Sequence, residues 1–523
     1  MKIKFTLAIL LFASLSQAQT PPGATVKSSI IVPQSMRTTP YDRYRTAIIP
    51  EGFKLSVYAR IPSARFMAIA PNGDLLVSVP NNGNIKLVRP NPTGDPFISN
   101  FVTGLSKPHD IVFHKIDATT YVYIAETDKI VRYKYVNGDI TGQNREVVVA
   151  NLPNASTTEL RGNYGHALKN IAIDMDHKLY ISIASTYNAC LSDTQSDPIR
   201  GSIYQYDADG KNMKLFAKGV RNAEGLAFVP GTNILWVVIN NRDNIAYPYE
   251  DNSGNYGKVL PSFVDNNPPE EFTKVIAGGD YGWPFCNPSN KSGYNDMPYD
   301  RDFEFNKNGA VDCSKMNRIS KGIRAHSAPL GLIFTQNTKM AEPYRNGAIV
   351  ALHGSWNRSK ATGYKVVYFP WNETTQTPGD EIPLVDGFIV PDSARSGNNN
   401  TGRPVDIAVD NDGNLFISDD DKGTILKLSS NNITGTNSEE SNYLIVKTYV
   451  ADGKLTANIE SKLSGTATIS LVNANGISIL EMTRLLNEET TSIHLNPTLN
   501  SGVYFLKVSI GNKENVSKIV VTR

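Results

Sequence analysis

Six stretches of the sequence repeat one pattern: a short apolar segment, a turn containing Gly, Asn or Asp, and a second apolar segment. The copies, of which FMAIAPNGDLLVSVPNNGNIKLV is the clearest, lie at residues 66–88, 109–133, 169–185, 224–241, 330–356 and 405–428. Apolar residues that alternate with a period of two predict strands, and no helical period competes with them. One strand-rich unit cannot bury both of its faces, but several arranged radially can. The sequence therefore predicts an all-β fold, with a six-bladed β-propeller over residues 45–428.

The insertions between the copies differ in length. They include residues 242–323, which we expect to form loops over one face of the propeller. Functional residues on such a scaffold belong on loops that rigid blades hold at the mouth of the central channel. The ends of the repeats are therefore the places to look for a site.

The pattern changes after the sixth copy. Residues 429–441, SSNNITGTNSEES, are polar and predict a linker. Short, regular, alternating strands follow over residues 442–523 and predict a small β-sandwich.

The first residues predict export. MKIKFTLAILLFASLSQAQ has two lysines, an apolar run and then small residues, so we expect residues 1–19 to be a cleaved signal peptide. That apolar run is too short to span a bilayer, and no other segment reaches the ~20 residues that a transmembrane helix needs. The formal net charge of +2 and the lack of a basic run give no reason to expect nucleic-acid binding.

An exported chain can form disulfides, and this one has three cysteines. Cys286 and Cys313 enclose a polar, loop-like stretch, so we expect these two to pair and Cys190 to stay free. No zinc-binding spacing is present.

Polar residues gather just before or just after the predicted blade strands. They are His166, Arg221, Asn222, Asn240, Asn241, Arg242, Asp243, Arg324, His326, His353, Arg358 and Arg403. A radial arrangement would bring these corresponding ends together at one mouth. Several arginines around one cavity indicate an anionic ligand, because guanidinium grips carboxylates with two parallel hydrogen bonds. A histidine among them can accept a proton near neutral pH.

Structural roles compete with these assignments. A single histidine beside a strand is more often hydrogen-bonded structure than a catalyst, and arginines at the bases of loops commonly hold backbone carbonyls. Asn and Asp after a strand are usually turn formers. The shared position in the repeat is what favours a site.

The propeller resembles the soluble, PQQ-dependent sugar dehydrogenases, most closely the sorbosone dehydrogenase-like branch. The motifs match in order: GHALKNIAI, VRNAEGLAF, NNRD, GGDYGWPFC, HSAPLGL, HGSWNRS and GRPVDIAV. The resemblance implies that His166 is the general base, which removes the hydroxyl proton while hydride passes to PQQ. It also implies that Arg403 and Arg358 bind the carboxylates of PQQ, and that Arg221 and Asn222 line the same pocket. His109 and His326 are further pocket candidates.

The same resemblance implies a Ca²⁺ ion between PQQ and the backbone carbonyls of Asn241 and Arg242, where it would polarise the quinone. The substrate would be the anomeric hydroxyl of an aldose, or a hydrated aldehyde such as sorbosone, and an external acceptor would take the electrons. The sequence has no GxGxxG fingerprint of a dinucleotide-binding fold and no CxxCH haem attachment site.

Two other functions fit a six-bladed propeller. A lactonase-type hydrolase would hold calcium through side-chain carboxylates, to which Glu224 or Asp243 could contribute. A carbohydrate-binding propeller without catalysis would bind sugar and turn nothing over.

The end of the chain, SGVYFLKVSIGNKENVSKIVVTR, resembles the C-terminal sorting domain of the type IX secretion system. This resemblance implies export across an outer membrane, followed by cleavage or surface attachment, with the secretion machinery as a partner. An ordinary accessory β-domain is the alternative.

Overall fold

A computed structural model describes residues 25–389 and 400–430, and residues 444–521 except for 452–453, 462, 474–476, 488–489, 496–498, 500–501 and 511–512. The chain divides into two compact units, Met1–Asn431 and Asn432–Arg523, and each is described here by itself. The expected signal peptide at 1–19 lies outside the described residues, as does the expected linker from residue 431 onward. No helix among the described residues is long and apolar enough to cross a membrane.

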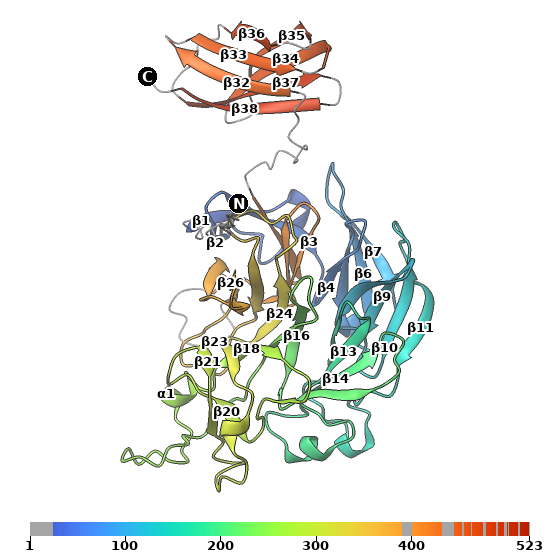
Figure 1. The fold of residues 1–523 in the computed structure, drawn as a ribbon, viewed down its shortest axis with the longest axis vertical. Helices are drawn as coiled ribbons and strands as arrows, with labels where there is room; N and C mark the ends of the chain where they lie inside the picture. The colour runs from blue at the N-terminus through green and yellow to red at the C-terminus, as the bar shows by residue number, and fades with distance from the viewer. Residues whose placement is uncertain are drawn as a thin grey trace, which may run out of the picture. The chain divides into compact units, whose positions relative to one another are not determined.

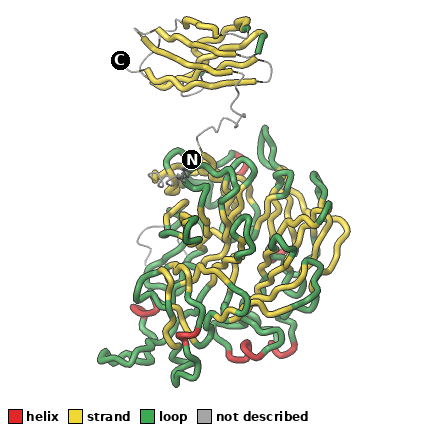
Figure 2. Tube along the Cα trace, in the orientation of Figure 1, coloured by secondary structure: helices red, strands yellow, loops and turns green. Residues whose placement is uncertain are grey.

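The first unit contains six blades of mainly antiparallel strands (Figures 1 and 2). Blade one is β4 (Met67–Ile69), β5 (Leu75–Val79), β6 (Asn84–Arg89) and β7 (Phe97–Val102). Blade two is β8 (Ile111–Ile116), β9 (Thr119–Ala125), β10 (Ile130–Tyr135) and β11 (Gln143–Val149). Blade three is β12 (Asn170–Ile173), β13 (Lys178–Ile183), β14 (Ser202–Asp207) and β15 (Lys214–Lys218), and β19 (Gly279–Asp280) is added parallel to β15.

Three further blades complete the set. Blade four is β16 (Ala223–Phe228), β17 (Leu235–Ile239), β18 (Glu270–Val275), β23 (Ile319–Ile323) and β21 (Asn295–Met297). Blade five is β24 (Pro329–Phe334), β25 (Gly347–Leu352), β26 (Lys365–Asn372), β27 (Thr377–Pro378) and β28 (Ile382–Val385). Blade six is β29 (Pro404–Val409), β30 (Leu415–Asp419), β31 (Thr424–Ser430), β3 (Phe53–Arg60), β1 (Thr25–Ile31) and β2 (Thr46–Pro50).

The first strands of the blades form a closed ring. β4 contacts β8, which contacts β12, and the contacts continue through β16, β24 and β29 back to β4. Blade six joins the two ends of the unit, because β3 pairs with β31 in the register Phe53↔Ser430 to Arg60↔Thr424. The predicted all-β fold with a six-bladed propeller is confirmed.

A recurring turn explains how the repeat forms its blades. In blades one and six, the turn between the first two strands has a glycine in the left-handed region, Gly73 with φ 89° and Gly413 with φ 82°. His177 takes the same place in blade three with φ 58°. In blades three and six an aspartate that opens the turn, Asp174 or Asp410, accepts two backbone N–H groups from it. This local chemistry fixes the strand register within each blade, independently of the packing between blades.

Apolar side chains between neighbouring blades form the core. Between blades two and three, for example, Tyr123, Ile130, Leu179 and Ile181 are buried in one cluster. Each blade thus buries one face against the blade before it and the other against the blade after it, as the radial arrangement requires.

The expectation that residues 242–323 form only loops is wrong. The segment supplies β18, β21 and β23, which complete blade four, and it also contains α1 (Pro261–Val264), β20 (Cys286–Pro288) and β22 (Tyr299–Arg301). The physical reason is that β16 and β17 need further strands on their outer edge. Phe272 of β18 and Ile323 of β23 are buried in the resulting cluster.

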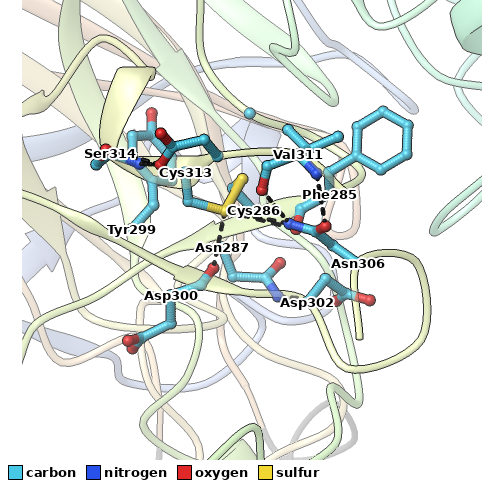
Figure 3. The surroundings of a disulfide bond; sticks show 12 residues. Phe285, Cys286, Asn287, Tyr299, Asp300, Asp302, Asn306, Val311, Cys313 and Ser314 are labelled. Atoms are coloured by element: carbon cyan, nitrogen blue, oxygen red, sulfur yellow. Dashed lines mark hydrogen bonds between the residues drawn. A yellow bond between two sulfur atoms is a disulfide. The ribbon is translucent and has the colours of Figure 1, made fainter. Parts of the chain in front are cut away.

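The predicted disulfide is confirmed: Cys286 and Cys313 are bonded, and Cys190 is a free cysteine (Figure 3). Beside the bond, the Asn306 side chain donates to the carbonyl of Val311 over 2.8 Å and accepts its N–H over 2.9 Å. These two hydrogen bonds close the turn from Asn306 to Val311 within the polar stretch between the two cysteines.

The second unit has two sheets. One is β32 (Leu444–Ala451), β33 (Lys454–Ser461) and β36 (Thr490–Leu495); the other is β35 (Ser478–Leu486), β34 (Gly465–Asn473), β37 (Gly502–Ile510) and β38 (Lys513–Val521). Leu455 and Ile459 of the first sheet share one buried cluster with Ile469 and Leu506 of the second. The predicted small β-sandwich is confirmed.

Candidate active site

The ends of the blade strands enclose a cavity of about 240 Å³, here called the first cavity. Its lining comes from the segments before the innermost strands and after the second strands of the blades. The residues are Arg65, His166, Arg221, Asn222, Asn240, Asn241, Asp243, Glu270, His326, Ala328, Leu330, His353, Gly354, Trp356, Asn357 and Arg403. The family resemblance placed nine residues at the site, and six of them are brought together here: His166, Arg221, Asn222, Asn241, His326 and Arg403.

Three arginines face the first cavity from equivalent positions, Arg65 ahead of β4, Arg221 ahead of β16 and Arg403 ahead of β29. Backbone carbonyls hold two of them. Arg403 donates to the carbonyls of His353 and Gly354 over 3.1 and 2.8 Å. Arg221 donates to those of Asn188 and Asn240 over 2.9 and 3.0 Å. These carbonyls fix both guanidinium groups; within the described residues Arg403 has no ion pair, whereas Arg221 also lies 3.7 Å from the Asp243 carboxylate.

The ring of His166 has a defined tautomer. Its Nδ1 lies 2.9 Å from the carbonyl oxygen of Ser185 and 3.0 Å from Ser185 Oγ, which itself donates to the Tyr187 carbonyl. Both neighbours accept, so Nδ1 carries the proton and Nε2 carries the lone pair. Burial and the nearby charge of Arg221 lower the pKa of His166 to about 4. At neutral pH the ring is therefore an unprotonated acceptor on the cavity wall.

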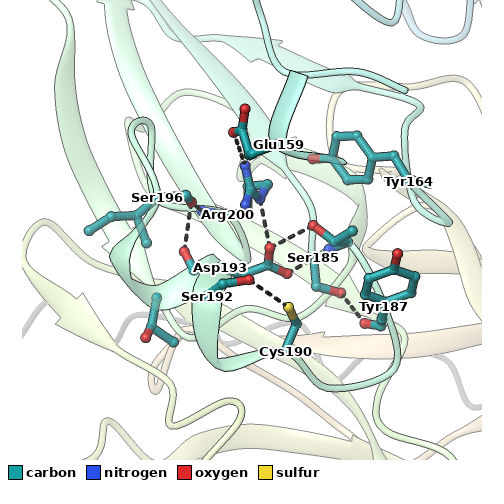
Figure 4. A network of polar contacts seen from close by, with 12 residues as sticks. Glu159, Tyr164, Ser185, Tyr187, Cys190, Ser192, Asp193, Ser196 and Arg200 are labelled. Carbon is teal, nitrogen blue, oxygen red and sulfur yellow. Dashed lines mark hydrogen bonds and ion pairs between the residues drawn. The ribbon is translucent and has the colours of Figure 1, made fainter. Parts of the chain in front are cut away.

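A buried ion pair holds the segments around His166 (Figure 4). Arg200 Nε donates to Asp193 Oδ1 over 2.6 Å, and both side chains are at most 2% exposed. Asp193 also accepts the N–H and the hydroxyl of Thr186 over 2.6 Å each, and the Thr186 carbonyl accepts the N–H of Gly165 over 2.9 Å. This chain of contacts fixes Gly165, which precedes His166, and Thr186, which follows its hydrogen-bond partner Ser185.

A second chain of charges holds Arg65 and His353, which both line the first cavity. Asp420 accepts from Arg65 over 2.5 Å and from His353 Nε2 over 2.9 Å. Burial would raise the pKa of the Asp420 carboxyl, but the hydrogen bond from His353 and the charge of Arg65 outweigh it and hold that pKa well below its usual range. Asp420 is thus an anion that fixes the position of Arg65.

Asp243 links several cavity residues. Its carboxylate accepts from Asn357 Nδ2 over 2.9 Å and lies 3.5 Å from His326 Nδ1 and 3.7 Å from Arg221 Nη2. The backbone N–H of Asn241 donates to Glu270 over 2.6 Å, and burial raises the pKa of Glu270 to about 7.

The structure does not bring Arg358, His109 or Arg242 to the lining of the first cavity. Arg358 donates to the carbonyls of Lys360 and Ala325. Arg242 pairs with Asp302 and Glu304 of the insertion, whose negative charge draws its side chain away. His109 is fully buried under Arg65, whose Nε donates to its Nε2 over 3.2 Å.

Sequence reasoning missed Arg65, Asp420 and Asn188. Arg65 stands one residue before the first repeat copy, so the rule that found Arg221 and Arg403 would also have found it. Asn188 lies in a loop between blade strands and carries no such signal. Its side chain accepts from Arg221 and from the N–H of Asp243 over 3.2 and 2.7 Å.

Comparisons with known proteins agree with this fold. Residues 48–431 match the family described as TrAA12-like. The chain belongs to the TrAA12-like family. Residues 451–522 match the secretion system C-terminal sorting domain. The comparisons confirm the expected relationship to the sugar dehydrogenase propellers. They also confirm the sorting tail and the destination that it implies, secreted or at the cell surface.

Individual relatives of this TrAA12-like chain are distant. An uncharacterised protein from Borreliella burgdorferi is 26% identical over 391 residues, which are 72% of this chain and 88% of that protein. A Trichoderma reesei carbohydrate-active enzyme of family AA12 has a TM-score of 0.60 at 19% identity, with 73% of this chain and 97% of that one covered. The holo PQQ domain of pyranose dehydrogenase from Coprinopsis cinerea has a TM-score of 0.59 at 20% identity, covering 74% and 97%. These two similarities show the shared fold.

Proposed function

We propose that this chain is a PQQ-dependent sugar dehydrogenase whose first cavity binds the cofactor. One observation supports the proposal most strongly: Arg65, Arg221 and Arg403 face a single cavity together with the unprotonated Nε2 of His166. PQQ carries three carboxylates, and guanidinium groups are the side chains best suited to bind them. The holo structure of the Coprinopsis cinerea domain belongs to a protein of the same fold.

The cavity has unused polar atoms that suit such a ligand. Arg403 uses Nε and Nη2, and Arg65 uses Nε and Nη1, in the hydrogen bonds made within the described residues. The Nη1 amino group of Arg403 and the Nη2 amino group of Arg65 thus remain for a carboxylate. The Oδ1 of Asn357 is buried and has no partner in the part of the chain that the structure describes. A buried polar atom left in this way is one that a ligand or water satisfies.

His166 would serve as the general base. Its Nε2 accepts the proton of the hydroxyl being oxidised, while the Ser185 carbonyl holds Nδ1–H and stabilises the ring as it becomes charged. When bound, PQQ would act as the two-electron acceptor for the hydride that leaves the carbon bearing this hydroxyl. Loss of this proton and hydride converts an anomeric hydroxyl to a lactone, or a hydrated aldehyde to an acid. The electrons then pass to an external acceptor.

Within that reaction, the substrate we propose is an aldose or a sorbosone-like sugar aldehyde. The cavity wall contributes amide side chains from Asn222, Asn240 and Asn357, and Trp356 stands at its edge with 65% of its surface exposed. Sugar-binding sites commonly combine amide side chains, which form hydrogen bonds with hydroxyl groups, with an exposed aromatic ring.

A calcium ion fits the proposal only with help from the cofactor. No group of three or more His, Cys, Asp or Glu side chains among the described residues could hold a metal. The ion would therefore rely on backbone carbonyls, those of Asn241 and Arg242 in the proposal, and on oxygens of PQQ. A calcium structure exists for the Trichoderma reesei enzyme of the same fold.

The hydrolase alternative depends on side-chain carboxylates at the metal. Glu224 is not part of the cavity lining, and Asp243 is surrounded by Asn357, His326 and Arg221. Neither arrangement favours a lactonase.

Dye-linked oxidation tests the proposal. The purified protein is assayed against a panel of aldoses and sugar aldehydes before and after addition of PQQ and Ca²⁺, and His166→Gln runs beside it. We expect activity that requires PQQ and falls by a factor of about 10²–10⁴ in the variant, which still binds PQQ. Sugar binding without dye reduction would instead favour the non-catalytic propeller.

A further inference from the structure

A second cavity, of about 340 Å³, lies beside the first. Arg65 lines both cavities, and the second is also lined by Gly165 and Ala167, the two neighbours of His166. The rest of its wall is mostly polar, and includes Ser63, Asn81, Lys107, Tyr164 and Asp420. A molecule whose reacting end reached His166 could therefore extend into this second space.

The charges of the second cavity do not cancel. Arg65 and Asp420 form an ion pair with each other at 2.5 Å. Lys107 has no ion pair or side-chain hydrogen bond within the described residues, and its side chain faces solvent at this wall. The lining therefore has one positive charge without a counterion, and that charge is accessible.

The backbone presents Lys107 in a fixed, strained conformation. Its φ is 48°, in the left-handed region that disfavours side chains, and its N–H donates to the Leu105 carbonyl over 3.1 Å. The adjacent Ser106 is held by its N–H to Glu126 over 2.5 Å and by its carbonyl to Thr127 N–H over 3.0 Å. The turn is thus anchored to the end of β9 and cannot relax freely.

The same strain recurs at both cavities. Ser63, also on the second wall, has φ 59°, while His326 and Ala328 on the first wall have φ 64° and 52°. Backbone strain of this kind persists where the surrounding structure enforces it, and it clusters at sites that bind ligands. The backbone at Ser63 and Lys107 is thus held in place on the wall of the second cavity, as it is at His326 and Ala328 on the wall of the first.

We propose that the second cavity is a subsite for an acidic sugar unit, with Lys107 pairing the carboxylate of a uronate. The inference rests on the proposed function and narrows its substrate to acidic disaccharides. The reducing aldose unit presents its anomeric hydroxyl to His166, and the uronate unit lies against Asn81 and Ser63, whose polar groups bond hydroxyls. The carboxylate takes the place of the missing counterion.

Calorimetric titration of the full chain tests this. The two ligands are cellobiose and cellobiouronic acid, which has a glucuronate in place of the non-reducing glucose. We expect the acidic disaccharide to bind about fivefold more tightly, the factor that an exposed ion pair of about 1 kcal/mol supplies. Lys107→Gln should remove that preference, so that the two disaccharides bind with equal affinity. Lys115→Gln, a change of an exposed lysine on β8 of the same blade, should keep it.

Three results would overturn the subsite: equal affinity for both disaccharides, a preference that survives Lys107→Gln, or no binding of either one at millimolar concentration. The titration is done without PQQ and again with PQQ bound, so it does not depend on turnover. Failure of the proposed function would show separately, as no dye reduction from any aldose in the presence of PQQ and Ca²⁺.

Discussion

His166 donates its Nδ1–H to the backbone carbonyl of Ser185 across 2.9 Å, and this one contact fixes which ring nitrogen is free. The free Nε2 belongs to a ring that burial and Arg221 keep unprotonated. The catalytic role proposed for His166 follows from this geometry, because a base must hold its lone pair toward the substrate in the resting state.

The pKa of His166 is directly measurable. NMR titration of ring-labelled protein, which has seven histidines in all, should show one that protonates near pH 4, and that signal should vanish in His166→Gln. Because the folded pKa lies below the ordinary 6.5, the unfolded chain takes up the proton first, so His166 lowers stability as the pH falls from about 6.5 toward 4. A midpoint at or above 6.5 would contradict the proposed burial and the influence of Arg221.

Binding of PQQ should move that pKa. The carboxylates that we propose would neutralise Arg221, one of the two causes of the low value, so the His166 midpoint should rise when PQQ is added. The same titration, repeated with saturating PQQ, measures the shift. An unchanged midpoint would mean that the anion does not approach Arg221.

The Arg200–Asp193 pair should contribute strongly to stability. Arg200→Met leaves the Asp193 carboxylate buried without its partner, which costs about 3–5 kcal/mol in the free energy of unfolding. Urea unfolding measures this cost. Arg318→Met is the matched control: its pair with Asp296 is 51% and 74% exposed, and its loss should cost no more than about 1 kcal/mol. Equal effects of the two substitutions would refute the structural role given to Arg200.

The disulfide should stabilise the propeller by restricting the unfolded chain. Cys286 and Cys313 are 27 residues apart, and a loop of this length corresponds to about 3–4 kcal/mol. In a Cys286→Ser/Cys313→Ser double variant, urea unfolding should show a free energy of unfolding that is lower by that amount. Cys190→Ser should leave the unfolding midpoint unchanged. The prediction fails if Cys190→Ser destabilises the protein as much as loss of the bond does.

Calcium and PQQ should bind together. The described residues provide no cluster of three metal-binding side chains, so Ca²⁺ alone should bind weakly and PQQ should tighten it. Calorimetry of Ca²⁺ into protein with and without PQQ compares the two affinities. Tight calcium binding in the absence of PQQ would favour a metal site of another kind.

The repeat copies predicted the blades well because their information is local. Alternation, together with turns such as those at Gly73 and Gly413, specifies strand pairs without reference to the rest of the chain. Residues 242–323 escaped prediction because β18 begins with Glu270 and Glu271, two charged residues that resemble a loop in the sequence but are 3% exposed in the structure. In the folded protein Asn241 donates hydrogen bonds to both carboxylates, and this long-range contact allows the two residues to lie in a buried strand.

For the site, position in the repeat located the residues, but it did not give the direction of their side chains. Arg403 and Arg358 both lie at repeat ends, yet only Arg403 reaches the cavity. Arg358 is bonded to the carbonyl of Ala325 instead. Asp302 and Glu304 similarly draw the Arg242 side chain to themselves, and no local sequence pattern predicts such long-range ion pairs.

Titration of the PQQ-free protein with PQQ, followed by absorbance, tests the central claim most directly. The account predicts one saturable site, bound more weakly by at least tenfold when Arg403→Gln removes a guanidinium and bound with little change in His166→Gln. A non-saturable response, or equal affinity in Arg403→Gln and the unmodified protein, would contradict binding of PQQ by the arginines of the first cavity.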